Sequence, residues 1–350
     1  MIKKISLFIV VIAFSVIFNL LTQSSSEAAS VGCTKNTDGT AILVTPGVKP
    51  FTLAGTSTTV DQCSQEPDQY KIKFYKAALC SDDPYKGSAD PSFESCIDIL
   101  SSEKEVILEP GVDTDLLDGE DLVLPIGSYT YFTVIVHNHL NLKHKQQYLL
   151  SNGNAADIFG NTSGNGAWCW SKAAVTTYSG DTYDADYNTA HGVTVVDSGT
   201  GTTNARLECG ANEPSASDIG WATEIIDDLA DNPDSDPFSA DTGGYFSVES
   251  DTGITGLEMA GALLKTDNTS IAANANEARR INGTFKYSSP IIISENTTSF
   301  KLFITTYSSV SIDMAIDTGD SNKIWAAKMG ADPFTIQVKT KTKRRRGAWR

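Results

Sequence analysis

The stretch LPIGSYTYFTVIVHNHL, residues 124–140, carries the clearest indication of the fold. Pro125 and Gly127 are typical of a turn, because proline restricts one backbone angle and glycine accepts conformations that are closed to other residues. An alternation of β-branched and aromatic side chains follows at residues 129–137. Such residues favour strands. We therefore predict a turn that leads directly into a β-strand.

Similar patterns occur on both sides of this stretch, in a chain rich in Thr, Ser, Gly, Asn and Asp. In YKIKFYKA, residues 70–77, apolar and lysine-bearing positions alternate, as in a sheet with one buried face. One helix is predicted at 218–231, where apolar residues recur at spacings of three and four. Further strands are predicted at 41–45, 97–100, 105–108, 284–287, 291–294, 299–305, 310–316, 324–328 and 334–339.

A Gly- and Asn-rich segment at 151–166 predicts a boundary between two domains. We expect an all-β protein with two disulfide-stapled β-sandwich domains, immunoglobulin-like or prealbumin-like, and one short helix. The predicted parts are a signal peptide at 1–29, an N-terminal β-sandwich at 30–150, a linker at 151–166, a C-terminal β-rich domain at 167–340 and a basic tail at 341–350.

The turn and strand within residues 124–140 resemble the closing strand of prealbumin-like and Cna-B-like β-sandwich modules of bacterial surface proteins. The resemblance covers about a dozen residues. It implies a sandwich architecture and assigns no functional residue.

The first residues predict export. A basic start with Lys3 and Lys4 precedes an apolar run at 5–21, and small residues follow at 26–29. This order is typical of a signal peptide, and we expect cleavage there rather than retention as a membrane anchor. Lipidation at Cys33 is a third interpretation, which Ser30 disfavours because a lipobox has a large aliphatic residue at that position. We expect the protein in the periplasm, on the cell surface or outside the cell.

Six cysteines follow the signal, an even number that fits complete oxidation in an exported chain. A zinc site is disfavoured because no pair has the Cys-x-x-Cys spacing. Fifteen pairings are possible, and the nearest-neighbour one is the simplest. It joins Cys33 with Cys63, Cys80 with Cys96 and Cys169 with Cys209.

The charge is strongly asymmetric along a chain of net charge −16. Residues 207–264 contain thirteen acidic side chains and no Lys or Arg, whereas residues 339–350 contain seven basic ones. Such an acidic chain disfavours nucleic acid as a partner, because phosphate groups repel it. The simplest interpretation is two solvated charged segments, and the alternative is mutual attraction within a chain or between copies.

Three groups of residues have side chains that can act as metal ligands. His137 and His139 are predicted on one face of a strand, near His144, where two imidazoles can share a metal. Exposed histidines beside Lys143 and Lys145 are the favoured interpretation, because positive charge repels a cation. A dense oxygen cluster predicts either a structural calcium site or ordinary turns, and turns are favoured. Its members are Asp181, Asp184, Asp186 and Asn188, and a second acidic cluster holds Asp231, Asp234 and Asp236.

No motif of nucleophilic catalysis or phosphate binding is present in the sequence, so no catalytic residue is assigned and no organic cofactor is expected. We expect a non-enzymatic structural or adhesive protein of the bacterial envelope, with itself, other envelope proteins or glycans as partners. Its basic strand at 334–343 is predicted to add to the sheet edge of a neighbouring copy. The alternative is a carbohydrate-binding module or periplasmic solute-binding protein, and a secreted hydrolase is third. The aromatic residues predicted to contact a sugar are Trp168, Trp170, Tyr178 and Tyr183.

Overall fold

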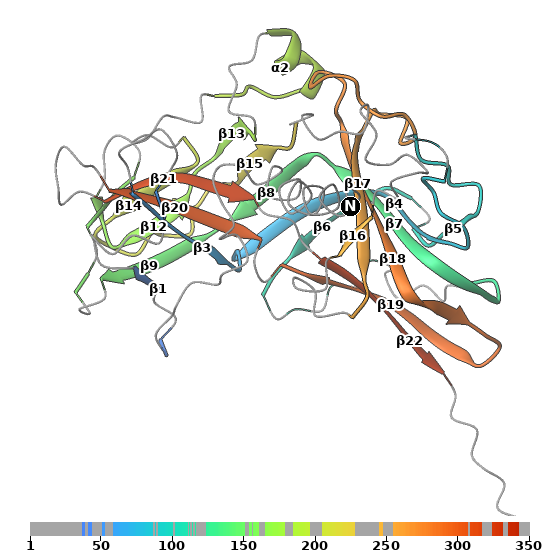
Figure 1. The fold of residues 1–350 in the computed structure, drawn as a ribbon. Coiled ribbons are helices and arrows are strands. Elements are labelled where there is room, and N and C mark those ends of the chain that lie inside the picture. The colour runs from blue at the N-terminus through green and yellow to red at the C-terminus, as the bar shows by residue number, and fades with distance from the viewer. Residues whose placement is uncertain are drawn as a thin grey trace, which may run out of the picture.

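A computed structural model describes much of the chain (Figure 1). The described residues are 37–38, 41–43, 51–52, 59–86, 88, 90–100, 102–110, 112, 114, 116, 124–150, 154–155, 157–160, 165–178, 185–196, 205–227, 245–247, 255–306, 309–316, 324–331 and 335–342. Regular structure within these ranges is almost entirely β-strand, with one helix, α2 (Ala185–His191). The prediction of an all-β protein is confirmed for this part of the chain, and its single short helix lies at 185–191 rather than at the predicted 218–231.

The largest sheet has the strand order β13-β15-β8-β4-β7-β18-β17-β16, and β5 and β6 also pair with β4. β4 is central, because β7 and β8 pair along one side of it and β5 and β6 along the other. The strands are β4 (Gln69–Cys80), β5 (Cys96–Asp98), β6 (Lys104–Leu108), β7 (Gly127–His137), β8 (His139–Lys143), β13 (Ala174–Thr177), β15 (Ala222–Ile225), β16 (Phe246–Ser247), β17 (Glu258–Leu264) and β18 (Arg280–Ile293).

The described part of the chain forms three smaller sheets as well. A four-stranded sheet, in the order β1-β9-β12-β14, holds β1 (Ala41–Leu43), β9 (Lys145–Leu150), β12 (Trp168–Ser171) and β14 (Leu207–Gly210). A six-stranded sheet, in the order β11-β10-β21-β20-β3-β2, holds β2 (Phe51–Thr52), β3 (Thr59–Gln65), β10 (Ile158–Phe159), β11 (Asn165–Gly166), β20 (Val310–Ile316) and β21 (Ile324–Ala331). The last sheet pairs β19 (Thr297–Thr305) with β22 (Thr335–Thr342).

The strands β7, β8 and β9 follow one another along a path that bends at Asn138 and at His144. β7 and β8 belong to the largest sheet, whereas β9 belongs to the four-stranded sheet, so the second bend transfers the chain between sheets. Asn138 is fully buried, and its Nδ2 donates to the backbone oxygens of Ile226 at 3.0 Å and Ala278 at 3.1 Å. These hydrogen bonds take the place of main-chain hydrogen bonds that a strand loses where it bends.

The core explains why the stretch around β7 is so apolar. Phe132, Val134 and Val136 contribute to the main core, while Ile135 packs into a second cluster with Ala260 on the other face. β7 is thus buried on both faces and pairs with β4 and β18 on either side. The predicted strand is confirmed, but it is central in its sheet rather than a closing strand.

Other predicted strands are confirmed with shifted bounds. The two predicted at 284–287 and 291–294 are parts of the single strand β18, whose register with β7 shifts between Lys286 and Ile291. The sequence did not predict β2, β3, β8 to β14, β16 or β17. The predictions at 41–45, 70–77, 97–100, 105–108, 299–305, 310–316, 324–328 and 334–339 correspond to β1, β4, β5, β6, β19, β20, β21 and β22.

The predicted helix at 218–231 is wrong. Residues 222–225 form β15, which pairs with β13 in parallel and with β8 antiparallel. All four residues of β15 are buried, so the segment lacks the apolar and polar alternation of a half-exposed strand. An apolar run of this kind cannot be told from a buried helix by spacing alone.

The sheets do not divide at the predicted linker. β10 and β11 lie within residues 151–166, and β3 pairs with β20 while β7 pairs with β18. The main core likewise joins Tyr70 to Ile336 in one cluster. Two separate sandwich domains and an immunoglobulin-like fold are therefore not confirmed.

Two of the three predicted disulfides are confirmed, Cys80–Cys96 between β4 and β5 and Cys169–Cys209 between β12 and β14. In each case the two cysteines are directly paired residues of neighbouring strands. For the predicted Cys33–Cys63 bond, Cys63 lies in β3 but Cys33 lies outside the described residues, as does the signal peptide. Two disulfides are compatible with an exported protein. Among the described helices, none is long and apolar enough to cross a membrane.

Candidate functional site

The predicted calcium ligands are only partly described. Asp186 and Asn188 lie in α2, where side chains two positions apart do not face each other. The Asn188 Oδ1 atom accepts a hydrogen bond from the Val195 backbone N at 2.9 Å. Within the described ranges, no three His, Cys, Asp or Glu side chains form a group suited to a metal ion. The other predicted ligands, Asp181, Asp184, Asp231, Asp234 and Asp236, lie outside the described residues.

The predicted sugar-contacting residues do not gather on one open face. Trp168 and Trp170 are half-buried on β12, on either side of Cys169. The Trp170 ring lies over Gly210, where an added Cβ would be 3.0 Å from the ring. Tyr178 is buried, so its ring offers no face to a sugar, and Tyr183 lies outside the described residues. Sugar binding by the two tryptophans stays a prediction.

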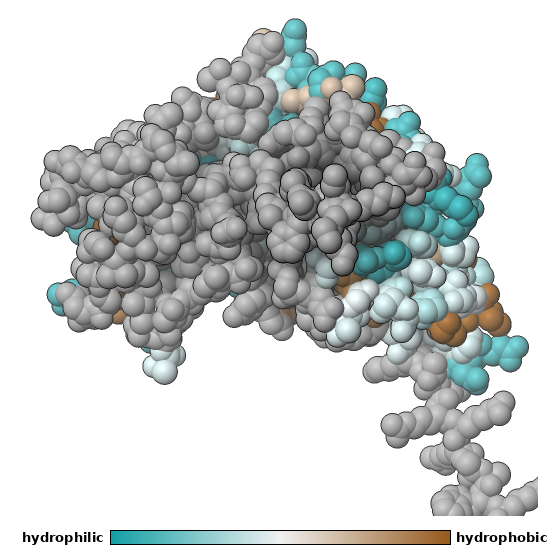
Figure 2. All heavy atoms as spheres, viewed as in Figure 1, coloured by the Kyte–Doolittle hydropathy of each residue, from teal (hydrophilic) through white to brown (hydrophobic). Residues whose placement is uncertain are grey.

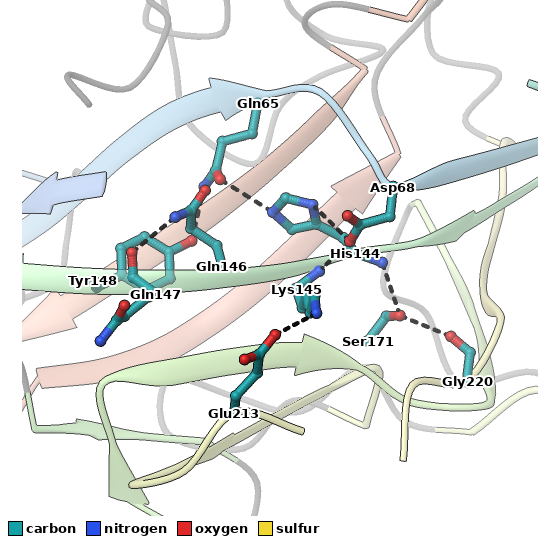
Figure 3. Close-up of polar contacts among 10 residues, drawn as sticks. All are labelled: Gln65, Asp68, His144, Lys145, Gln146, Gln147, Tyr148, Ser171, Glu213 and Gly220. Atoms are coloured by element: carbon teal, nitrogen blue, oxygen red, sulfur yellow. Dashed lines mark hydrogen bonds and ion pairs between the residues drawn. The ribbon is translucent and has the colours of Figure 1, made fainter. Parts of the chain in front are cut away.

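His144 lies in a buried polar network at the bend between β8 and β9 (Figure 3). Its Nε2 is 3.1 Å from Gln65 Oε1, and Gln65 Nε2 donates to the Tyr148 hydroxyl at 2.7 Å. The Gln65 oxygen is therefore an acceptor, which places a proton on His144 Nε2. His144 Nδ1 faces the Asp68 carboxylate at 4.0 Å.

Asp68, His144 and Ser171 have the residue types of a catalytic triad but not its geometry. The Ser171 Oγ accepts a hydrogen bond from the backbone N of His144 at 3.1 Å and donates to the Gly220 backbone O at 2.7 Å (Figure 3). The hydroxyl proton thus points to a carbonyl and not to the imidazole ring. The network fixes the bend of the chain, and Asp68 supports it by accepting from the Lys145 backbone N at 2.7 Å.

A second polar cluster lies where α2, at the top of Figure 1, meets the bend between β7 and β8. The bend brings the rings of His137 and His139 to a centroid distance of 4.2 Å. His191, the last residue of α2, places its Nδ1 3.2 Å from His139 Nε2. Tyr187 stacks on His191 at 4.1 Å. We call His137, His139 and His191, with Arg279 and Arg280, the histidine–arginine cluster.

Hydrogen bonding fixes where the protons of this cluster lie. The Arg279 Nη1 atom is 3.0 Å from His191 Nε2. A guanidinium can only donate, so His191 Nε2 accepts and the proton of the neutral ring is on Nδ1. His191 Nδ1 then donates to His139 Nε2. The competing contact of His191 Nε2 with the Ala275 backbone O would need a proton on Nε2, and at 3.3 Å it is longer than the contact with the arginine, so we assign the proton to Nδ1.

The second arginine is held beside an aromatic ring. The Arg280 guanidinium carbon lies 3.5 Å from the Tyr75 ring centroid, and the Arg280 Nε donates to Asn268 Oδ1 at 3.2 Å. Lys73 lies over the same ring at 4.7 Å and forms an ion pair with Glu103 at 2.8 Å. Three basic side chains therefore lie beside the histidines in a chain that is acidic overall.

Burial keeps all three histidines of the cluster neutral near pH 7. Desolvation is the largest cause of the lowered pKa in each ring. The positive charge of Arg280 adds to it for His137, whose pKa is lowered to about 4. The pKa of His139 is lowered to about 3, with His137 as the next cause, and the pKa of His191 is lowered to about 4, with Arg279 as the next cause.

These shifts predict that acid destabilises the protein between pH 6.5 and about pH 4. Unfolded histidine takes up a proton near pH 6.5, whereas the folded rings do so only near pH 4, so the unfolded state binds more protons in this window. Each histidine contributes a slope of up to about 1.4 kcal/mol per pH unit. We expect the urea midpoint of unfolding to fall from pH 7 to pH 5.

The matched control is a His191→Gln variant, which keeps the size and polarity of the side chain but cannot titrate. Its midpoint is expected to depend less steeply on pH than that of the wild type. Equal slopes for the two proteins would contradict the prediction. The charged groups around the rings keep their charge above pH 5, which confines the comparison to the histidines. They are Lys73, Glu103, Arg279 and Arg280, and the hydrogen bond from Lys73 lowers the pKa of Glu103.

Sequence reasoning found only part of this cluster. His137 and His139 were singled out, but the interpretation of exposed strand-end histidines is wrong, since His144 is 2% exposed and the other two are half-buried. His191 and the two arginines were missed. They lie on α2 and at the start of β18, and no local pattern connects those positions with residue 139.

Comparison with protein families, with curated proteins and with solved structures finds no significant match. The fold and the cluster describe a β-rich protein with disulfides between neighbouring strands. Beside its helix lies a basic site that contains histidines.

Proposed function

We propose that this is an exported, non-enzymatic structural or adhesive protein of the bacterial envelope, which assembles with copies of itself through the edge of β22. The supporting observation is the isolated sheet formed by β19 and β22 at the lower right of Figure 1. Within the described residues β22 pairs only with β19, from Thr335 to Thr342. Its other edge therefore has main-chain groups that can pair with another strand.

The sheet is anchored firmly enough to present this edge. Leu302 on β19 and Ile336 on β22 are buried in the main core, and Phe300, Ile304 and Val338 pack against it. A two-stranded sheet needs such packing to be stable. A fixed edge loses less conformational entropy on association than a free segment would.

Exposed apolar side chains lie near the same end of the molecule. Ile126 is 65% exposed and Ile292 is 53% exposed, and they flank the last paired residues of β7 and β18. Figure 2 shows hydrophobic residues gathered at the lower right, where Figure 1 places the end of β18. Burial of two isoleucines in a contact would contribute favourably to association.

Charge favours a head-to-tail contact over pairing of two β22 strands. β22 carries Lys339 and Lys341 and precedes a basic tail, so two copies of it would repel each other. The acidic stretch 207–264 includes β16, the outermost strand of the largest sheet. Pairing of β22 with β16 of the next copy joins opposite charges, and a contact between two different surfaces generates open chains of subunits.

We expect the oxidised chain from residue 30 to form large assemblies at low salt that dissociate as salt rises, because salt screens exposed charges. Light scattering at both salt concentrations measures this. A chain cut after Lys339 loses the last paired residues of β22 and is expected to stay monomeric. A chain cut after Thr342 keeps β22 and is expected to assemble with weaker salt dependence.

The charge-reversed variant Lys339→Glu with Lys341→Glu is expected to abolish assembly at low salt. Its control is Lys86→Glu with Lys265→Glu, which makes the same change in net charge on exposed loops and is expected to leave assembly intact. Far-ultraviolet circular dichroism shows whether each variant is folded. The proposal fails if the chain cut after Lys339 assembles as the full-length chain does.

A further inference from the structure

In the histidine–arginine cluster, the ring nitrogens that have no hydrogen-bond partner among the described residues are all donors. His137 Nδ1 accepts from the His139 backbone N at 3.0 Å, so the proton of the neutral His137 ring is on Nε2. His139 Nε2 accepts from His191, so its proton is on Nδ1. Neither of these two N–H groups has a hydrogen-bond partner among the described residues. Neither nitrogen is among the fully buried side-chain atoms that lack a partner.

The two arginines add further donors, and the nearby carboxylate of Glu103 acts on Arg280 through its charge but forms its ion pair with Lys73. Arg279 uses its Nη1 for His191 and for the Ala278 backbone O, and Arg280 uses Nε for Asn268 and Nη1 for a backbone oxygen. Neither guanidinium forms an ion pair in the described part of the chain, whereas several lysines do. A guanidinium has five N–H donors in all, so both retain unused ones.

The carboxylates nearest to the cluster are already engaged. Glu103 forms an ion pair with Lys73 at 2.8 Å. Asp227 is buried and accepts a hydrogen bond from the Tyr187 hydroxyl at 3.1 Å. Donors and positive charge thus predominate, which disfavours a metal cation and favours an anion. Arginine in particular suits the planar geometry of a carboxylate or phosphate.

We propose that the histidine–arginine cluster binds an oxyanion, a carboxylate or a phosphate, through His137 Nε2–H, His139 Nδ1–H and the guanidinium groups of Arg279 and Arg280. The binding geometry is set in advance by the chain from Arg279 through His191 to His139, which orients the His139 ring. Such preorganised donors lose little entropy when the anion binds. This site is independent of the β22 edge and of the assembly proposed above.

The chain has only four histidines, which makes their ring nitrogens a direct probe. We would label the histidine rings with ¹⁵N and titrate the protein at pH 7 with sodium phosphate, and separately with sodium galacturonate, at constant ionic strength. The resonances of His137, His139 and His191 are expected to shift with saturation. His144, buried in its own network with Gln65, is the internal control and is expected not to shift. A response to one probe alone identifies the type of oxyanion.

Arg279→Gln is expected to weaken binding by about tenfold, because it removes a charge-assisted donor and the partner of His191. Arg280→Gln tests the second guanidinium if the first variant does not fold. Lys172→Gln, which removes the charge that pairs with Glu208 and does not act on the three histidines, should leave the affinity unchanged. The proposal is overturned if sodium chloride produces the same shifts, if no ring responds to either probe, or if His144 moves together with the others.

Discussion

Replacement of Glu224 by leucine is expected to lower the free energy of unfolding by about 3–5 kcal/mol. Glu224 and Arg206 form an ion pair at 3.0 Å in which both side chains are only 2% exposed. The variant would remove the carboxylate that pairs with this buried arginine, which costs far more than the loss of a surface pair. Equilibrium unfolding in urea measures the change.

Glu224 lies on β15, but its carboxylate also holds a strand of another sheet. Its second carboxylate oxygen accepts a hydrogen bond from the Ala331 backbone N at 2.7 Å, at the end of β21. β15 belongs to the largest sheet and β21 to the six-stranded sheet, so one carboxylate connects two sheets and a buried arginine. Loss of the side chain therefore leaves a buried N–H unsatisfied as well.

Two variants separate charge from packing. Arg206→Met with Glu224→Leu removes both charges and is expected to be more stable than Glu224→Leu alone, because the buried arginine charge is removed together with its carboxylate. Lys86→Gln breaks an exposed ion pair with Asp82 and is expected to leave the urea midpoint almost unchanged. A Glu224→Leu protein with the midpoint of the wild type would show that the buried pair contributes nothing net to stability.

The sequence predicted strands better than it predicted their arrangement. β4 and β7 were recognised because their side chains follow a local alternation of β-branched, aromatic and charged residues. The pairing of β3 with β20 joins residues about 250 positions apart, and no local pattern encodes it. The linker was placed at 151–166 from glycine and asparagine content, although short strands there join the six-stranded sheet.

The errors at the candidate sites have the same physical origin. β15 resembled a helix because burial on both sides removes the signal that separates the two structures. The histidine–arginine cluster depends on the bend at Asn138 and on the packing of α2 against it. His139 and Arg279 meet through tertiary contacts, so the sequence could indicate their chemistry but not their proximity.

Removal of the Cys169–Cys209 disulfide is expected to lower the free energy of unfolding by about 4 kcal/mol on the chain-entropy model. The bond closes a loop with a sequence separation of 40, whereas Cys80–Cys96 has a separation of 16 and is expected to contribute about 3 kcal/mol. The longer loop restricts the unfolded chain more. Urea unfolding of the two double variants, each with both cysteines replaced by alanine, tests this order.

The same bond is expected to affect the histidine–arginine cluster. The loop that it closes contains α2, and with it His191, which bridges Arg279 and His139. Once the loop is open, local unfolding of α2 requires less free energy than global unfolding. We therefore expect the His191 ring resonance to broaden or shift in Cys169→Ala with Cys209→Ala, while the His144 resonance stays in place. Cys80→Ala with Cys96→Ala is the matched control, since its loop excludes α2. An unchanged His191 resonance in both variants would show that packing alone holds the helix against the bend at Asn138.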